Sequence, residues 1–405
     1  MMASLPRVRQ SLTDPAFVQD PWAFYARAQA LGPLVFWEEY DLPCAISHAA
    51  VNAILRDRRF GREPLPEAQP PVPEHLAPFY AVEAHSMLEL EPPRHTRLRG
   101  LVLRAFTSRR IQAMAPEIAA LARDLARALP EGPCDLLPAF ARPLPVIVIA
   151  RLLGVPESMA PQLLAWSNAM VGMYLARPSR AMEEAAARAA TEFSAFLRAY
   201  VEERRARPAD DLITRLIAAE EDGARLSTDE MISTCILLLN AGHEATVHTL
   251  GNAVKALLEW APDRSALAAA LAPERIAGTV EEVLRFDAPL HLFTRHVYAE
   301  AEVAGHRFRR GDRVALLLGA AGRDPALCPE PERFDPFRPE TPHLAFGAGL
   351  HFCVGAPLAR LELQTALPIL FAERPGLRLA TPPAYADVYH FHGLAALPVI
   401  AGPAR

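Results

Sequence analysis

The sequence of 405 residues predicts a mainly α-helical protein with small β-sheets. Alanine-rich amphipathic stretches dominate the chain from Pro21 to Trp260, and their apolar residues recur at helical spacing. Strand-like segments are short, and most of them lie after residue 290. Because 51% of the residues are hydrophobic, the chain can bury a large core, either as one domain or as two.

The predicted elements follow one another along the chain. Helices are expected over Phe24–Leu31, Ala49–Arg56, Arg94–Phe106, Arg110–Leu129, Ala181–Arg205 and Asp229–Trp260. Strands are expected over Val35–Trp37, Cys44–Ser47, Leu290–Val303, Arg307–Leu317 and Leu377–Ile400. Proline clusters at residues 64–78 and 325–342 predict irregular connections.

The segment that ends at Trp260 predicts one helix of roughly 33 residues, about 50 Å long. Ser227 and Glu230 have the spacing of a capping box at its start. Residues 235–239 are all apolar, so we expect the helix to be buried. A polar insert follows at residues 240–246, in which Glu244 supplies an acid and Thr246 a hydroxyl. The alternative is a buried helix with one turn facing solvent.

Composition excludes several classes of partner. The net charge of −5, without a basic tail, argues against nucleic acid. Neither a signal peptide nor an uninterrupted apolar stretch of about 18 residues is present. Five widely spaced cysteines are typical of a reducing compartment. We therefore expect a cytoplasmic monomer that contacts no membrane.

Cys353 lies in a loop that suits a metal-bound thiolate. Gly347, Gly349 and Gly355 allow the chain to curl tightly around the sulfur and to lie flat against a planar ligand. Pro357 then marks the first turn of a helix, whose N-terminus favours an anion. The alternative is a small buried core residue, as most free cysteines are.

Other metal centres fit this cysteine less well. The remaining cysteines are scattered and form no CxxC run, which disfavours an iron–sulfur cluster; they are Cys44, Cys134, Cys235 and Cys328. The absence of a CxxCH motif excludes covalently attached c-type haem.

Residues 346–355 resemble the signature F-G-x-G-x-H-x-C-x-G of the cytochrome P450 family at every fixed position. This resemblance extends from the Pro92 region to the tail. It implies a triangular, helix-rich single domain over residues 1–405, with a small β-rich subdomain from the N-terminal strands and the C-terminal part. It further implies a b-type haem between the long central helix and the helix after the cysteine loop, with Cys353 as the iron ligand.

The resemblance also implies how the haem is held. Its propionates need cationic or N–H partners, and the family pattern assigns this role to His95, Arg99, Arg295 and His351. His95 and Arg99 stand four residues apart and share one helix face. Further cofactor contacts are expected from Phe346, Gly347, Gly355, Ala241 and Gly242.

Glu282 and Arg285 match the family's E-x-x-R pair, and Arg338 is the third member of that group. The expected role is structural. A buried, hydrogen-bonded ion network would hold the segment that carries the cysteine loop, and its disruption would leave an unpaired buried charge.

The polar insert resembles the family's oxygen-binding motif, A-G-x-[E/D]-T-[T/S], with one departure. Ala245 occupies the position directly after the acid, where the family usually has threonine. The resemblance assigns proton delivery to Glu244 and Thr246. With alanine at 245, Thr246, an ordered water or a hydroxyl of the substrate is expected to replace the missing alcohol.

The family's substrate-lining segments map to mostly apolar residues of this chain, which suggests an apolar substrate. The candidates are Phe79, Met87, Met170, Leu237, Leu238, Leu290, Leu292, Phe293 and Phe391. For any one of them, a place in the ordinary core explains the residue equally well.

The resemblance implies a haem-thiolate monooxygenase that uses O2 and oxidises a small hydrophobic molecule. Little chain follows Cys353, so NAD(P)H electrons are expected through a reductase and a separate ferredoxin or flavodoxin. Its docking patch would be arginine-rich, with Arg94, Arg97, Arg104, Arg109, Arg110 and Arg360. The alternatives are a peroxygenase or an oxidative-coupling enzyme and, in another class, a haem sensor or electron carrier. Glu244 and Thr246 speak against the latter class, since a carrier needs no proton relay.

Overall fold

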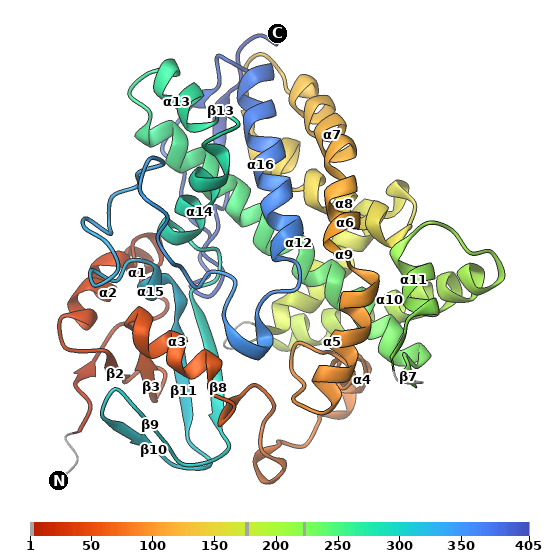
Figure 1. Cartoon of the computed structure of the whole chain (residues 1–405), viewed down its shortest axis with the longest axis vertical. Coiled ribbons are helices and arrows are strands. Elements are labelled where there is room, and N and C mark those ends of the chain that lie inside the picture. The colour runs from red at the N-terminus through yellow and green to blue at the C-terminus, as the bar shows by residue number, and fades with distance from the viewer. Residues whose placement is uncertain (1–3, 175–177, 222–223, 405) are drawn as a thin grey trace. The chain divides into compact units, whose positions relative to one another are not determined.

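The protein is seen in a computed structural model that describes residues 4–174, 178–221 and 224–404. The prediction of a mainly α-helical fold with small β-sheets is confirmed (Figure 1). Within the described ranges, no helix combines the length and the apolar composition that crossing a membrane requires. Contacts divide the chain into two compact units. The first contains Met1–Leu65, Glu117–Ala141 and Ala245–Arg405, and the second contains Pro66–Pro116 and Arg142–Glu244.

Helices build the second unit. The longest of those that lie wholly within it, α10, packs against α4 and α9, where the ring of Trp166 stacks on Phe193 with centroids 5.0 Å apart. Its helices are α4 (Ala77–Glu83), α5 (Arg94–Ala105), α6 (Ser108–Ala113), α8 (Pro143–Leu153), α9 (Ala160–Val171), α10 (Arg180–Ala206) and α11 (Leu212–Ala218). Short 3-10 turns lie at Pro66–Ala68, Glu74–Leu76, Glu157–Met159 and Gly172–Tyr174, and one hairpin joins β6 (Glu220–Glu221) to β7 (Ala224–Arg225).

A six-stranded sheet organises the N-terminal part of the first unit. The strand order is β1 (Arg7–Val8), β2 (Leu34–Trp37), β3 (Leu42–Ala45), β11 (Arg313–Leu317), β8 (Leu292–Val297) and β4 (Phe60–Gly61). Strand β11 pairs in parallel with β3 and antiparallel with β8, so segments far apart in sequence lie side by side (Figure 1). Aromatic side chains from α1 (Pro15–Gln19) and α2 (Trp22–Gln29), including Phe17 and Phe24, pack on Trp37 and form a core on this sheet.

The remaining elements of this unit are mostly helical. They are α3 (His48–Arg56), α7 (Ala115–Ala128, which enters the unit at Glu117), the π-helix Leu137–Ala141, α13 (Arg264–Ala270), α14 (Ile276–Phe286), α15 (Leu318–Gly322), the 3-10 turn Gly349–His351 and α16 (Ala356–Glu373). This unit also contains two small sheets. One is the hairpin of β9 (Ala301–Val303) and β10 (His306–Phe308), and the other has the order β12 (Arg378–Leu379), β13 (Pro398–Ile400) and β5 (Pro133–Asp135).

Helix α12 (Thr228–Trp260) confirms the long helix, and the boundary between the two units falls within it, after Glu244. The capping box is present. The Ser227 amide donates to Glu230 at 2.8 Å, and the Glu230 amide donates to the Ser227 hydroxyl at 3.2 Å. Residues 231–240 are buried, as the apolar run predicts.

Four sequence predictions are wrong in detail. The single strand expected over 290–303 is divided into β8 and β9. The single helix expected over 110–129 is split into α6 and α7 just before Pro116, which lacks an N–H and whose ring crowds the preceding turn. The strand expected over 307–317 is divided by Gly311, which has φ +96°. The tail from Leu377 to Ile400 forms only the two short strands β12 and β13, with irregular chain between them.

Candidate functional site

The loop around Cys353 is a tight turn held by its own backbone. The Cys353 amide donates to the carbonyl of Phe346 at 3.0 Å, which closes the loop on itself. Gly349 has φ +68°, and a side chain there would lie 2.2 Å from the Leu55 carbonyl. Only glycine fits at this point. Helix α16 begins three residues after the cysteine, so the sulfur lies beside a helix N-terminus, as predicted.

Cys353 differs chemically from the buried cysteines. Burial raises the pKa of Cys44 and of Cys235 to about 12, so both are neutral thiols at pH 7. Cys353 is only half-buried. Cys353 also lies close to Arg360. Glu281 is the main cause that raises the pKa of Arg360, and the charge of Cys353 adds to this effect. A nearby guanidinium favours the thiolate, which is the form that binds a metal.

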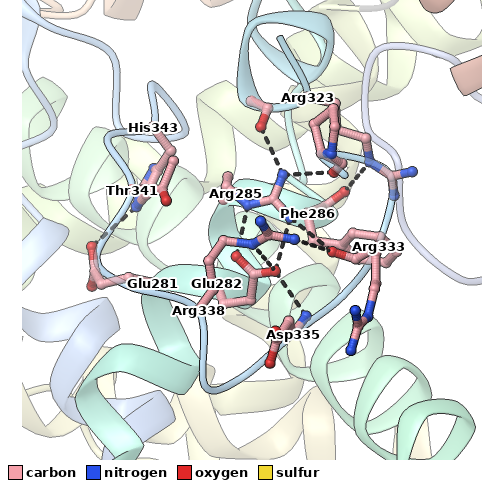
Figure 2. A network of polar contacts seen from close by, with 12 residues as sticks. Glu281, Glu282, Arg285, Phe286, Arg323, Arg333, Asp335, Arg338, Thr341 and His343 are labelled. Atoms are coloured by element: carbon pink, nitrogen blue, oxygen red, sulfur yellow. Dashed lines mark hydrogen bonds and ion pairs between the residues drawn. The ribbon is translucent and has the colours of Figure 1, made fainter. Parts of the chain in front are cut away.

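Glu282, Arg285 and Arg338 meet in one buried network (Figure 2). Arg285 donates to both carboxylate oxygens of Glu282, at 2.7 and 2.8 Å, and Arg338 donates to Oε1 at 3.3 Å. The Asp335 amide donates to the same oxygen at 2.9 Å. The three side chains are 9% exposed or less, so their charges are compensated almost entirely by one another and by the backbone.

The two arginines also bind the chain that leads to the cysteine loop. Arg285 donates to the carbonyls of Gly322 at 3.0 Å and Pro331 at 2.8 Å. Arg338 donates to the carbonyls of Pro329 and Arg333 at 2.6 and 2.9 Å. Residues 322–338 have little regular structure of their own, so these bonds supply the order that secondary structure does not.

The polar insert of α12 is continuous helix with a mixed surface. Ala241 is exposed, Gly242, Glu244 and Ala245 are half-buried, and Thr246 is 5% exposed. His243 is fully buried, its Nδ1 donates to the Leu239 carbonyl at 3.0 Å, and its Nε2 lies 3.3 Å from Glu244 Oε2. The insert therefore holds an acid, an imidazole and a hydroxyl within four residues.

The expected propionate partners lie on three elements. Helix α5 carries His95, which is 1% exposed, and Arg99 one turn later. In the first unit, β8 carries Arg295, which is 3% exposed, and the 3-10 turn within the cysteine loop carries His351.

The candidate substrate residues are divided between the units. In the second unit the structure buries Phe79, Met87, Met170, Leu237 and Leu238. In the first unit, Leu290 and Phe391 face each other in an isolated antiparallel β-bridge, and Leu292 and Phe293 follow in β8. Leu290, Phe293 and Phe391 are only half-buried.

Comparison with known proteins identifies the family. The family described as Cytochrome P450 matches residues 276–373, the part that contains both the triad and the cysteine loop. The monooxygenase PikC of Streptomyces venezuelae is 36% identical over 98% of this chain and 95% of its own. The chain belongs to the cytochrome P450 family.

Two further similarities agree with this result. The vitamin D(3) 25-hydroxylase of Pseudonocardia autotrophica is 38% identical over 98% of this chain and 97% of its own. The crystal structure of P450BioI in complex with an acyl carrier protein carrying hexadec-9Z-enoic acid has a TM-score of 0.88 and 33% identity, covering 95% of this chain and 98% of P450BioI. By family, this P450 is a haem-iron monooxygenase.

The residues present fit the haem that the family implies. A half-buried cysteine in a closed loop beside a helix N-terminus is a suitable thiolate donor, and Cys353 has this position. The closed backbone turn gives Cys353 one defined position. The position of Cys353 is thus compatible with its holding the iron.

Sequence reasoning missed a second ion network in this P450, formed by Glu281, His343 and Arg360. Arg360 donates to both oxygens of Glu281 at 2.7 Å, and His343 Nε2 donates to Oε2 at 3.0 Å. The Arg360 guanidinium lies 4.6 Å from the ring centroid of Phe346. Although burial alone would raise the pKa of Glu281, Arg360 and His343 lower it to about 2. The network thus holds the ring of Phe346, the first residue of the cysteine loop, in place.

The same residues line a surface pocket of about 190 Å³ together with Phe346, Phe352 and Glu340. Glu281 directly precedes the predicted triad member Glu282, yet its partners are 62 and 79 residues away. No motif spacing signals such a network. The paired acids at 281 and 282 were the only available hint.

Proposed function

We propose that this P450 uses O2 and electrons from a separate ferredoxin to insert one oxygen atom into a small hydrophobic substrate. The observation that carries the proposal is that this one chain contains both the closed cysteine loop and an acid and a hydroxyl in α12. When bound, a thiolate-ligated haem activates O2 and favours cleavage of the O–O bond. The residues of the chain would hold that group, exclude water and deliver protons.

His95, Arg99, Arg295 and His351 are proposed as partners of the haem propionates. The family pattern supports this role, and His95 and Arg295 are both buried, at 1% and 3% exposed. Phe346, Gly347, Gly355, Ala241 and Gly242 are proposed to line the haem.

Glu244 is proposed to move protons, with Thr246, an ordered water or a substrate hydroxyl in the place of the missing threonine. Ala245 has no hydroxyl, and its carbonyl accepts a bond from the Thr249 hydroxyl at 2.7 Å. Thr249 is thus engaged with its own helix backbone. Thr246 supplies a hydroxyl within the insert itself and is 5% exposed.

The substrate is proposed to be apolar, because the nine candidate lining residues are aliphatic, aromatic or methionine. The names of the relatives support this chemistry, since one hydroxylates vitamin D(3) and another binds a fatty acyl chain on its carrier protein. Leu290, Phe293 and Phe391 are half-buried, as residues that border a ligand space would be.

A ferredoxin is proposed as the electron donor, docked on exposed arginines. Arg94, Arg104 and Arg109 are exposed on α5 and α6. Of the other expected members, Arg97 pairs with Glu230, Arg110 with Asp210 at 2.9 Å, and Arg360 with Glu281. The charge reversal Arg109→Glu is expected to slow electron transfer and to weaken its salt dependence. Arg378→Glu, at an exposed arginine on β12, is the matched control and is expected to change neither.

Reconstitution with a ferredoxin and its reductase tests the proposed function. Steady consumption of O2 and NADH that depends on an added apolar compound, with oxidised product formed, is the expected result. Turnover with hydrogen peroxide alone would favour a peroxygenase, an alternative that Ala245 supports. Reversible O2 or CO binding without turnover under any of these conditions would indicate a sensor or carrier and contradict the proposal.

A further inference from the structure

A buried polar cluster lies directly behind Leu290 and Phe391 in the first unit. We define the Asp287 cluster as Asp287, His291, Tyr385 and His392. Asp287, His291 and His392 are at most 2% exposed. His392 Nδ1 donates to Asp287 Oδ1 at 2.9 Å, and the Tyr385 hydroxyl donates to Oδ2 at 2.5 Å. Both carboxylate oxygens are therefore engaged.

The rings of the cluster form a stack. The ring of His392 lies between Tyr385, with centroids 3.8 Å apart, and His291, with centroids 4.4 Å apart. His291 in turn shares a 2.8 Å hydrogen bond with the hydroxyl of Tyr25 on α2. The orientation of His392 is thus fixed on both ring faces and at Nδ1.

Strand geometry connects this cluster to Leu290 and Phe391, two of the proposed substrate-lining residues, which we call the substrate wall. Leu290 and Phe391 form a single β-bridge, and it is flanked by backbone bonds from His392 to Pro289 at 2.9 Å and from His291 to His390 at 3.1 Å. Side chains alternate between the two faces of extended chain. The half-buried Leu290 and Phe391 therefore lie on one face, and the fully buried His291 and His392 lie on the other.

Helix α12 supports the same turn. Asn252 donates to the His392 carbonyl at 2.9 Å. Gly393 packs so closely on His248 that an added Cβ would lie 1.8 Å from its Nδ1. The chain around Phe391 forms only two isolated bridges, Leu290 with Phe391 and Tyr385 with Leu394, so side-chain bonds add to the little that a β-ladder fixes here.

Asp287, His291 and His392 also offer ligand atoms within 4.8 Å of one another, as a metal site would. The local charge opposes a cation. The half-buried Arg323 has its guanidinium 3.5 Å from the ring centroid of Trp22, which itself packs against His291 and His392. Burial would raise the pKa of Asp287, but His392, Tyr385 and Arg323 together hold it below its ordinary value. Arg323 thus supplies the positive charge that a metal would bring.

We infer that the bond between His392 and Asp287 positions Phe391 and Leu290, and thereby sets which ligands this side of the substrate site accepts. The inference rests on the proposed function in one respect, the assignment of these two residues to the substrate wall. His392 is a positioning residue, since it acts through Phe391 and Leu290. Loss of the bond between His392 and Asp287 allows the turn around Phe391 to move and changes the shape of the substrate wall. The cysteine loop is held by its own backbone bond and is not affected.

The experiment compares two haem-iron ligands on the holoenzyme by absorbance titration. Imidazole is small and reports the iron site, whereas 4-phenylimidazole also reports the surrounding wall. Removal of one hydrogen bond to a buried charge predicts that His392→Leu weakens 4-phenylimidazole binding about tenfold and leaves imidazole within about twofold. His392→Asn, whose amide can take the place of Nδ1–H, is expected to restore most of the affinity.

Arg374→Lys is the matched control, because Arg374 is equally buried but bonds to the backbone at Ala126 and Gly402. It is expected to lower the unfolding temperature without changing the ratio of the two affinities. An unchanged ratio in His392→Leu, an equal loss for both ligands, or a His392→Asn variant that behaves like His392→Leu would each overturn the inference. If His392→Leu fails to retain haem, Tyr385→Phe carries the test, with a smaller change in the same direction.

The outcome is separable from that of the proposed function. Azole binding requires neither turnover nor a known substrate. Absence of ferredoxin-supported oxidation alongside a changed affinity ratio would contradict the proposed function and leave the positioning role intact.

Discussion

Replacement of Glu282 by alanine removes the centre of the buried triad. Arg285 is fully buried and Arg338 is 9% exposed, and both lose their carboxylate partner. The Asp335 amide loses its acceptor as well. Breaking a buried pair by removing one partner costs about 3–5 kcal/mol, because the remaining charge stays desolvated. That cost is a large fraction of the roughly 5–15 kcal/mol by which a folded protein is stable.

The expected result is a protein that no longer retains haem, because residues 322–338 lose the bonds that hold them before the cysteine loop. Haem content per polypeptide and denaturant unfolding of the same preparations measure both effects. The control is Glu184→Ala, which breaks an exposed helical pair with Arg180, 46% and 61% exposed, and is expected to change the stability little. Normal haem content in Glu282→Ala, with a loss similar to that of the control, would refute the reasoning.

Three further predictions concern the cysteine loop and α12. Because the folded pKa of Glu281 is depressed to about 2, its stabilising effect is complete above an ordinary pKa of 4.5 and is lost as the pH falls toward 2. Denaturation at several pH values should thus show that the free energy of unfolding of the wild type exceeds that of Glu281→Gln by about 1–2 kcal/mol at pH 7, after allowance for solvent screening. This difference should shrink below pH 4.5. A difference that stays constant with pH would contradict the prediction. Gly349→Ala places a methyl group against the Leu55 carbonyl and should abolish haem retention, measured by absorbance, whereas retention at the wild-type level would show that the loop relaxes. Ala245→Thr should change the fraction of consumed O2 that appears in product, and identical coupling for every substrate tried would show that position 245 is irrelevant to proton delivery.

Local sequence patterns predicted the parts of the molecule that depend on near neighbours. The capping box, the buried run of α12 and the glycine loop around Cys353 each arise within a few residues, so spacing alone reveals them. The contacts of Arg338 with Glu282 were predicted only because the family pattern links these distant positions.

The contacts that escaped prediction join residues far apart in the chain. His392 lies 105 residues from Asp287, and Arg360 lies 79 residues from Glu281. A buried histidine or acid has no local signature that names its partner, because the partner is chosen by tertiary packing. The helix break before Pro116 was, by contrast, readable from the sequence, since proline has no N–H to donate and its ring crowds the preceding turn.

The most direct test of the central claim is the carbon monoxide difference spectrum of the reduced holoenzyme, measured beside that of Cys353→His. The wild-type protein is expected to show the long-wavelength Soret band of a thiolate-ligated haem, and the variant is expected to lose that band while retaining bound haem. A wild-type spectrum typical of histidine-ligated haem, or an unchanged band in Cys353→His, would contradict the assignment of Cys353 as the iron ligand.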